Sequence, residues 1–278
     1  MLKWQVNPGV PPLNKSRVCA VSFLNTVPLV YGMTDGEQRG AVDLQFAVPS
    51  ECARRIASGE ADVGLVPVIE MDRQGLAAVP GIGIACRGPV RSILLFAKTP
   101  LQSIRTFAAD ANSRTSVELA RIVLARRYGV EPAIVSMPPD LGSMLERADA
   151  ALLIGDSALA VDPSTHDLQC LDLGAAWLAM TGLPFVFAMW AGPASRITPQ
   201  LGDILDASCS YGLSHIGHIV AQEATRRPLP RALIEKYLTG NIVFRLGEAE
   251  RAGLELYLRY ARQLDDLVLA GPTTHGAA

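Results

Sequence analysis

Residues 113–118, Ser-Arg-Thr-Ser-Val-Glu, carry the strongest local signal for binding chemistry in this sequence. Thr115 and Glu118 have the S/T-x-x-E spacing of a capping box, which predicts that a helix begins here. Backbone amides at a helix start, together with hydroxyls and a guanidinium, would form a spot that suits a carboxylate. The groups concerned belong to Ser113, Arg114, Thr115 and Ser116. The capping box by itself still favours an ordinary capped helix over an anion site.

Ser92 is a second candidate for an anion contact. It follows Arg91 on a predicted strand that leaves the Arg-Gly-Pro turn at 87–89. We expect its side chain to face a ligand-binding cleft between two lobes of the protein. A lone serine on a strand is more typical of a solvent-facing hydroxyl, which stays the alternative.

Small polar groups also follow two further predicted strands. The segment 22–28, Ser-Phe-Leu-Asn-Thr-Val-Pro, contains Ser22 and Asn25 at the carboxyl end of the first strand, where an α/β sheet usually binds its ligand. The alternative is turn chemistry, with Asn25 and Thr26 capping the next helix. Asp156 follows strand 150–154 in the same way, and a helix cap is favoured over a hydroxyl acceptor or a domain-closing contact.

The elements that must position these groups alternate between apolar β-branched runs and amphipathic helices. This alternation predicts an α/β protein with mixed, mostly parallel sheets and right-handed crossovers. Strands are predicted at 17–22, 42–48, 63–66, 82–86, 90–97, 106–109, 133–136, 150–154 and 185–190. Helices are predicted at about 24–31, 49–56, 115–128, 141–148, 199–211, 214–226, 230–237 and 246–264, with no strand after 199.

A chain whose last third is helical must cover a sheet that was built earlier. We therefore predict a discontinuous α/β domain of residues 1–97 plus 192–278, with a second α/β domain, residues 98–191, inserted into it. Two lobes joined by two crossing strands form a hinged clamp with the ligand in the cleft between them.

Composition excludes several classes of protein. The 278 residues carry a net charge of -2 with 19% charged residues, which argues against an electrostatic nucleic-acid binder. The longest apolar stretch, 183–191, is far short of the roughly 20 residues that span a bilayer. The first 16 residues do not have the apolar core of a signal peptide, so we expect a cytoplasmic location. The five cysteines are irregularly spaced, which predicts free, mostly buried thiols in a reducing compartment.

Motifs for common cofactors and nucleophiles are missing from the sequence. It contains no G-x-G-x-x-G, no G-x-x-x-x-G-K-S/T and no G-x-S-x-G, so we expect no nucleotide cofactor and no serine-hydrolase chemistry. His215 and His218 are three residues apart on a predicted helix, but no other ligand lies at a suitable offset. We therefore expect no metal site there.

Six short segments together resemble the chorismate dehydratases of the futalosine route to menaquinone. The resemblance covers about residues 17–265. The fold of that family is similar to the fold of type II periplasmic binding proteins. The segments, in order, are SFLNTVP at 22–28, DVGLVP at 62–67, GPVRS at 88–92, SRTS at 113–116, LIGD at 153–156 and TGLPFVF at 181–187.

The resemblance implies conversion of chorismate to 3-[(1-carboxyvinyl)oxy]benzoate and water, with no cofactor. Asn25 matches an asparagine implicated in catalysis, and Ser92 and residues 113–116 match carboxylate-binding positions. An amide is not a general base at neutral pH, so we expect Asn25 to orient the substrate while the enolpyruvyl carboxylate takes the ring proton. The expected partner is a small dianion, without nucleic acid, membrane or obligate protein partner.

Two other functions stay open at this point. One is the related menaquinone-pathway enzyme that acts on cyclic dehypoxanthine futalosine, although its relatives do not have the Ser-Phe-Leu-Asn segment. The other is a non-catalytic clamp that binds a small anion, which the same fold would permit.

Overall fold

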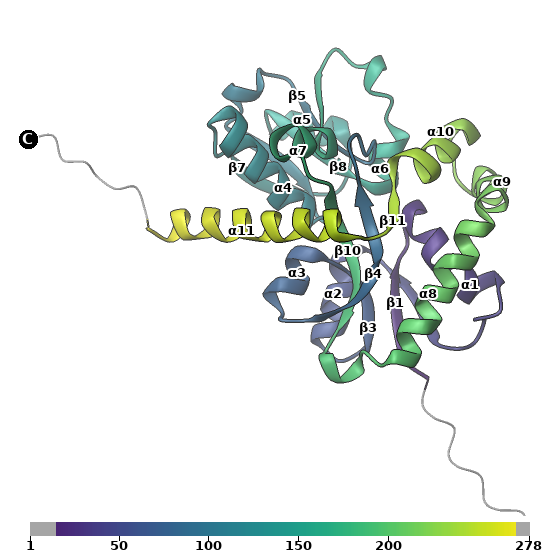
Figure 1. Cartoon of the computed structure of the whole chain (residues 1–278). Helices are drawn as coiled ribbons and strands as arrows, with labels where there is room; N and C mark the ends of the chain where they lie inside the picture. The colour runs from purple at the N-terminus through teal and green to yellow at the C-terminus, as the bar shows by residue number, and fades with distance from the viewer. Residues whose placement is uncertain (1–14, 271–278) are drawn as a thin grey trace, which may run out of the picture.

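Two mixed β-sheets organise the chain in the computed structural model, which describes residues 15–270 (Figure 1). The six-stranded sheet has the order β11-β4-β10-β3-β1-β2, and the five-stranded sheet has the order β7-β6-β8-β5-β9. The first contains β1 (Arg17–Val21), β2 (Asp43–Ala47), β3 (Val63–Pro67), β4 (Ala77–Cys86), β10 (Phe185–Gly192) and β11 (Val243–Arg245). The second contains β5 (Ile93–Ala97), β6 (Thr106–Asp110), β7 (Ala133–Met137), β8 (Ala150–Ile154) and β9 (Gln169–Asp172).

Both parallel and antiparallel pairs occur in each sheet, which confirms the α/β class with mixed sheets. Parallel pairing is found between β1 and its neighbours β2 and β3, and between β6 and its neighbours β7 and β8. The pairs made by β10, β4, β11, β5 and β9 are antiparallel, so the parallel share is smaller than predicted. Strands β3, β5, β8 and β10 are buried along their whole length, because helices cover both faces of the sheets.

The predicted helices begin close to the expected positions, often at a proline or an N-cap side chain, but the helix at 173–181 was not predicted. Pro49 opens its helix at the first position, and Thr198 accepts a hydrogen bond from the amide of Leu201 at the start of another. The helices are α1 (Val27–Asp35), α2 (Pro49–Ala57), α3 (Val68–Arg73), α4 (Thr115–Val123), α5 (Leu141–Arg147), α6 (Gly155–Ala160), α7 (Leu173–Thr181), α8 (Pro199–Ser214), α9 (Ile216–Arg226), α10 (Arg231–Lys236) and α11 (Glu248–Ala270). Short 3-10 or π segments include Leu24–Thr26, Leu124–Tyr128 and Tyr237–Asn241.

Two strands were missing from the sequence-based prediction. The expectation that no strand follows residue 199 is wrong, because β11 pairs with β4 at the edge of the six-stranded sheet. β9 pairs with β5 at the edge of the other sheet. Strands of three and four residues are too short to display an alternating pattern, so only their pairing reveals them.

Strand pairing also bears on the predicted domain limits at 97/98 and 191/192. The prediction placed β5 in the first domain and most of β10 in the inserted domain. Instead, β5 pairs only within the five-stranded sheet, and β10 pairs within the six-stranded sheet. The alternation of strands and helices in a sequence does not say which strands pair. We propose that the chain crosses between the lobes near 87–92 and near 182–184. Residues 1–14 and 271–278 of the predicted first domain lie outside the described residues.

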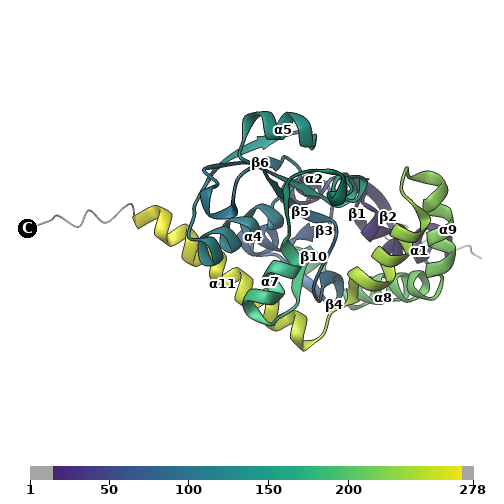
Figure 2. The ribbon, with the colours of Figure 1, turned by 90° about the horizontal axis from the view of Figure 1, so that it is seen from above.

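Helix α11 packs against both lobes. It packs on β10 and α3 of the six-stranded lobe and on α4 of the five-stranded lobe, and it runs across the molecule between them (Figure 1). Figure 2 shows α8 and α9 beside α1 at the opposite end from α4 and α11. Within residues 15–270, no helix is both long enough and apolar enough to cross a bilayer.

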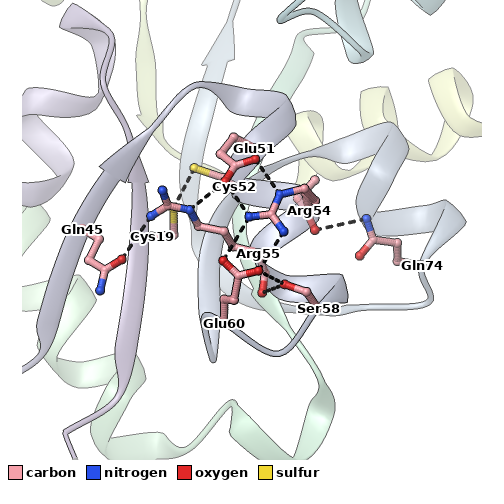
Figure 3. A network of polar contacts seen from close by, with 10 residues as sticks. Cys19, Gln45, Glu51, Cys52, Arg54, Arg55, Ser58, Glu60 and Gln74 are labelled. Atoms are coloured by element: carbon pink, nitrogen blue, oxygen red, sulfur yellow. Dashed lines mark hydrogen bonds and ion pairs between the residues drawn. The ribbon is translucent and has the colours of Figure 1, made fainter.

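A polar network anchors α2 to the neighbouring strands (Figure 3). The Arg55 guanidinium donates to Glu51 within α2 and to Gln45 on β2. Beneath it, the sulfur atoms of Cys19 on β1 and Cys52 on α2 lie 3.2 Å apart as free thiols. All five cysteines are free and only Cys170 is exposed, which confirms the prediction of free, mostly buried thiols.

Candidate active site

A pocket lies where the carboxyl ends of β1, β3, β6 and β8 meet the start of β5 and the middle of β10. The empty space between its lining atoms, part of which is open to solvent, is about 510 Å³. Both lobes contribute to its lining, as the clamp prediction requires. Six of the predicted site residues line it: Asn25, Ser92, Ser113, Arg114, Thr115 and Ser116. Its apolar walls include Phe23, Ile84, Ile93, Ile154 and Phe187.

The start of α4 forms one wall of the pocket. Its first backbone hydrogen bond runs from the Glu118 amide to the Arg114 carbonyl at 3.2 Å, so the amides of residues 115–117 have no acceptor within the helix. The predicted capping box is wrong, because Thr115 is the first helical residue and not the cap. The Glu118 carboxylate instead pairs with Arg121 at 2.9 Å. The helix therefore begins where predicted, and its first residues, Thr115 and Ser116, line the pocket.

The loop before α4 presents Ser113 to the pocket. Asp110, at the end of β6, accepts hydrogen bonds from the backbone and side chain of Asn112 at 2.9 and 3.0 Å, and its carbonyl accepts from the Ser113 amide. Burial raises the pKa of the Asp110 carboxyl. The Ser113 hydroxyl is buried without a hydrogen-bond partner. The Arg114 guanidinium turns back onto the Ser113 carbonyl at 3.1 Å.

Ser92 is held in the pocket by an unusual backbone conformation at the preceding residue. Arg91 has φ of 65°, and the Asp172 carboxylate accepts the amides of Val90 and Arg91 at 3.0 and 2.7 Å. The Arg91 guanidinium donates to the Ala158 carbonyl at 2.7 Å, which offsets part of the cost of the left-handed conformation. Ser92 is 1% exposed, so the alternative of a solvent-facing hydroxyl is wrong.

Asn25 and Ser92 are joined through Tyr237, a residue that sequence reasoning missed. The Asn25 Nδ2 atom donates to the Tyr237 hydroxyl at 3.1 Å, and that hydroxyl donates to Ser92 Oγ at 2.8 Å. Asn25 Oδ1 is buried without a partner. Neither adjoining helix has a side-chain cap bond, so the capping alternative for Asn25 and Thr26 is wrong. Tyr237 lies 145 residues from Ser92, and no local pattern marks it.

Asp156 and Ser22 lie outside the pocket lining. Asp156 Oδ1 accepts the Leu24 amide at 3.0 Å, and Oδ2 pairs with Arg227. Burial raises the pKa of the Asp156 carboxyl more than these two partners lower it. The favoured helix cap is wrong, since Ile154 is the cap residue of α6 and the carboxylate instead bridges the lobes. Ser22 is exposed, and its carbonyl accepts from Arg227 at 3.5 Å.

Comparison with known proteins gives one family and one fold. A family model described as "Menaquinone biosynthesis" matches residues 16–263. The chain is 30% identical over 229 residues to the chorismate dehydratase of Thermus thermophilus, covering 76% of this chain and 83% of that one. It is 23% identical over 253 residues to the chorismate dehydratase of Campylobacter jejuni, covering 88% of this chain and 97% of that one.

Solved structures share the architecture at low identity. A protein from Archaeoglobus fulgidus matches with a TM-score of 0.74 at 18% identity, covering 92% of this chain and all (100%) of that one. The periplasmic aliphatic sulphonate binding protein of Escherichia coli matches with a TM-score of 0.63 at 14% identity, covering 92% of this chain and 88% of that one. At these identities the likeness concerns the fold, and it confirms the periplasmic-binding-protein-like clamp.

Proposed function

The chain belongs to the menaquinone biosynthesis family, and from that premise we propose that it is a chorismate dehydratase, a hydro-lyase that converts chorismate to 3-[(1-carboxyvinyl)oxy]benzoate and water. The observation that carries the proposal is the match of residues 16–263 to the family, which spans both lobes of the pocket. The two chorismate dehydratases similar to the chain support the same activity.

The lining of the pocket suits a small dianion. Chorismate carries two carboxylates, an enolpyruvyl ether and one ring hydroxyl. We assign one carboxylate to the start of α4, where the amides of residues 115–117 and the Ser113 hydroxyl are available. Thr115, Ser116 and the main chain around Arg114 complete this wall. Ser92, directly before β5, contacts the other end of the molecule.

Proton transfer in this proposal is carried by the substrate. The lining consists of hydroxyls, one amide, apolar side chains and one ionisable group, Arg114, whose guanidinium does not accept a proton. The enolpyruvyl carboxylate takes the proton from the ether-bearing ring carbon, and the electron pair forms the new ring double bond. The neighbouring hydroxyl leaves and takes that proton, which yields water and restores the carboxylate. Asn25 is the catalytic side chain that orients the reacting groups.

Aromatisation supplies much of the driving force, so the protein needs mainly to position and desolvate its substrate. The apolar walls formed by Phe23, Ile154 and Phe187 exclude water from the reacting carbons. Ser22 and Asp156, both predicted to bind substrate, lie beside the pocket, and Asp156 acts by closing the lobes. We also propose a cytoplasmic location, with no nucleic-acid or membrane partner and no obligate protein partner.

Incubation of the purified protein with chorismate tests the proposal. The expected result is an aromatic absorbance together with a product mass that is lower by one water. A folded protein that binds chorismate and leaves it unchanged would favour a non-catalytic anion-binding clamp. A folded protein that ignores chorismate and turns over cyclic dehypoxanthine futalosine would favour the related pathway enzyme.

A further inference from the structure

Tyr237 is completely buried beside the pocket, and its hydroxyl contacts two of the side chains that line it. We propose that Tyr237 is a positioning residue that fixes the Asn25 amide with its oxygen toward the pocket and leaves the Ser92 hydroxyl hydrogen free for the substrate. The proposal rests on the function proposed above and assigns a direction to the hydrogen bonds that Asn25 and Ser92 offer to the substrate.

The direction follows from Tyr237 being the donor in its hydrogen bond with Ser92. A phenolic hydroxyl has one hydrogen to donate, and Tyr237 donates it to Ser92 Oγ at 2.8 Å. The Tyr237 oxygen can therefore only accept from Asn25. The end of the Asn25 amide that faces it must be the Nδ2 group, which lies 3.1 Å away. With the Tyr237 hydrogen directed at Ser92, the flipped amide would place two oxygen atoms against each other with no hydrogen between them.

Two consequences reach the pocket. Asn25 Oδ1 is turned away from Tyr237 and is buried without a partner, so it offers an acceptor. Ser92 Oγ already accepts from Tyr237, which leaves its own hydrogen to donate. Asn25 and Ser92 therefore present one acceptor and one donor, respectively, at fixed positions in the pocket.

These polarities select different parts of the substrate. With both carboxylates ionised, chorismate has a single O–H group, the ring hydroxyl, so only this group can donate to Asn25 Oδ1. The hydrogen bond turns an oxygen lone pair of the leaving hydroxyl toward the carboxyl group that holds the abstracted proton. Ser92 in turn donates to a carboxylate or ether oxygen. An acceptor at Asn25 also repels carboxylates, which fixes the orientation of the dianion.

Burial raises the pKa of Tyr237, so its hydroxyl keeps its hydrogen over the whole range in which an enzyme assay is practical. The direction of the chain from Asn25 to Ser92 should then not change between pH 6 and pH 9. We expect no ionisation of Tyr237 in the pH profile of kcat.

The test is Tyr237→Phe, which removes the hydroxyl and keeps the ring. We expect kcat to fall about 10- to 100-fold, because Asn25 and Ser92 lose their fixed orientation. In a protein that already carries Asn25→Ala and Ser92→Ala, adding Tyr237→Phe should cost less than twofold. Tyr31→Phe, which removes a buried hydroxyl bonded to Gln222 outside the pocket, is the matched control and should keep full kcat.

Two kinetic outcomes overturn the inference and leave the proposed function intact. One is a near-normal kcat in Tyr237→Phe. The other is a full 10-fold loss of kcat when Tyr237→Phe is added to the protein that carries Asn25→Ala and Ser92→Ala. An inactive wild-type protein would instead refute the proposed function. If Tyr237→Phe fails to fold, side-chain amide exchange in the wild-type protein decides. We expect a slowly exchanging side-chain signal that disappears in Asn25→Ala, whereas rapid exchange of the Asn25 amide would refute the hydrogen bond to Tyr237.

Discussion

The backbone amide of Leu24 donates to the Asp156 carboxylate at 3.0 Å, and this bond connects the two lobes beside the pocket. Leu24 follows β1 of the six-stranded sheet, and Asp156 lies in the first turn of α6, directly after β8 of the five-stranded sheet. Arg227, at the end of α9, pairs with the same carboxylate. The Asp156 carboxylate thus adds to the contacts that join the two lobes beside the pocket.

Asp156→Ala should loosen this arrangement. It leaves the Leu24 amide without its acceptor, and we expect a loss of about 1–3 kcal/mol in the free energy of unfolding by urea. Open conformations would become more populated, so KM for chorismate should rise several-fold. Asp140→Ala is the matched control, because Asp140 accepts a backbone amide within one lobe. An unchanged KM in Asp156→Ala would mean that the contact does not govern closure.

Asn25 should matter for turnover more than for binding. Asn25→Ala removes the buried Oδ1 acceptor, and we expect kcat to fall by about 100-fold with a smaller change in KM. Asn25→Asp places a negative charge beside a dianion, so it should also raise KM. Steady-state kinetics on chorismate separates the two effects. Near-normal kcat in the alanine variant would remove Asn25 from the mechanism.

Ser113→Ala should separate binding from stability. The Ser113 hydroxyl is buried and has no partner among the described residues, so its removal should leave the urea midpoint unchanged or slightly higher. The same change removes a donor for the substrate carboxylate, and KM should rise about 10-fold. Ser136→Ala, on the exposed edge strand β7, is the control. A large loss of stability in Ser113→Ala would show that this hydroxyl serves the fold.

Much of the pocket was predictable because its residues follow strands and begin helices. Ser113 to Ser116 lie after a buried strand and at a helix start, and both features are local in the sequence. Asn25 lies after β1 in the same way. The pocket lining itself was therefore implied once the chain was interpreted as a two-lobed α/β clamp, since strand ends converge in such folds.

Contacts between distant segments could not be predicted in this way. Tyr237 reaches Asn25 across 212 residues, and Asp172 holds the amide of Arg91 across 81. Nothing near Tyr237 or Asp172 in the sequence indicates either partner. The same reason explains the wrong assignment of Asp156, because a helix cap is a local interaction and a contact between lobes depends on how the lobes meet.

The start of α11 should make stability depend on pH. Glu250 is buried, accepts from the Arg87 guanidinium at 2.7 Å and from the Gly247 amide at 2.9 Å, and so links α11 to the crossing segment near 87–92. The Arg87 side chain holds the pKa of Glu250 below its usual 4.5. Below that value the unfolded chain binds the proton more readily than the folded one, so acid reduces the free energy of unfolding.

Glu250→Gln keeps an acceptor for the Gly247 amide and removes the charge that Arg87 pairs with. The contribution of the ionised Glu250 is complete above about pH 4.5 and disappears as the pH falls through its folded-state pKa. The variant should therefore have a lower urea midpoint than the wild-type protein at pH 7, and the difference between the two midpoints should shrink as the pH falls below 4.5. Glu248→Gln, at the exposed position two residues earlier, is the control. A gap between Glu250→Gln and wild type that stays constant from pH 7 to pH 3 would mean that the Arg87 pair does not stabilise the fold through its charge.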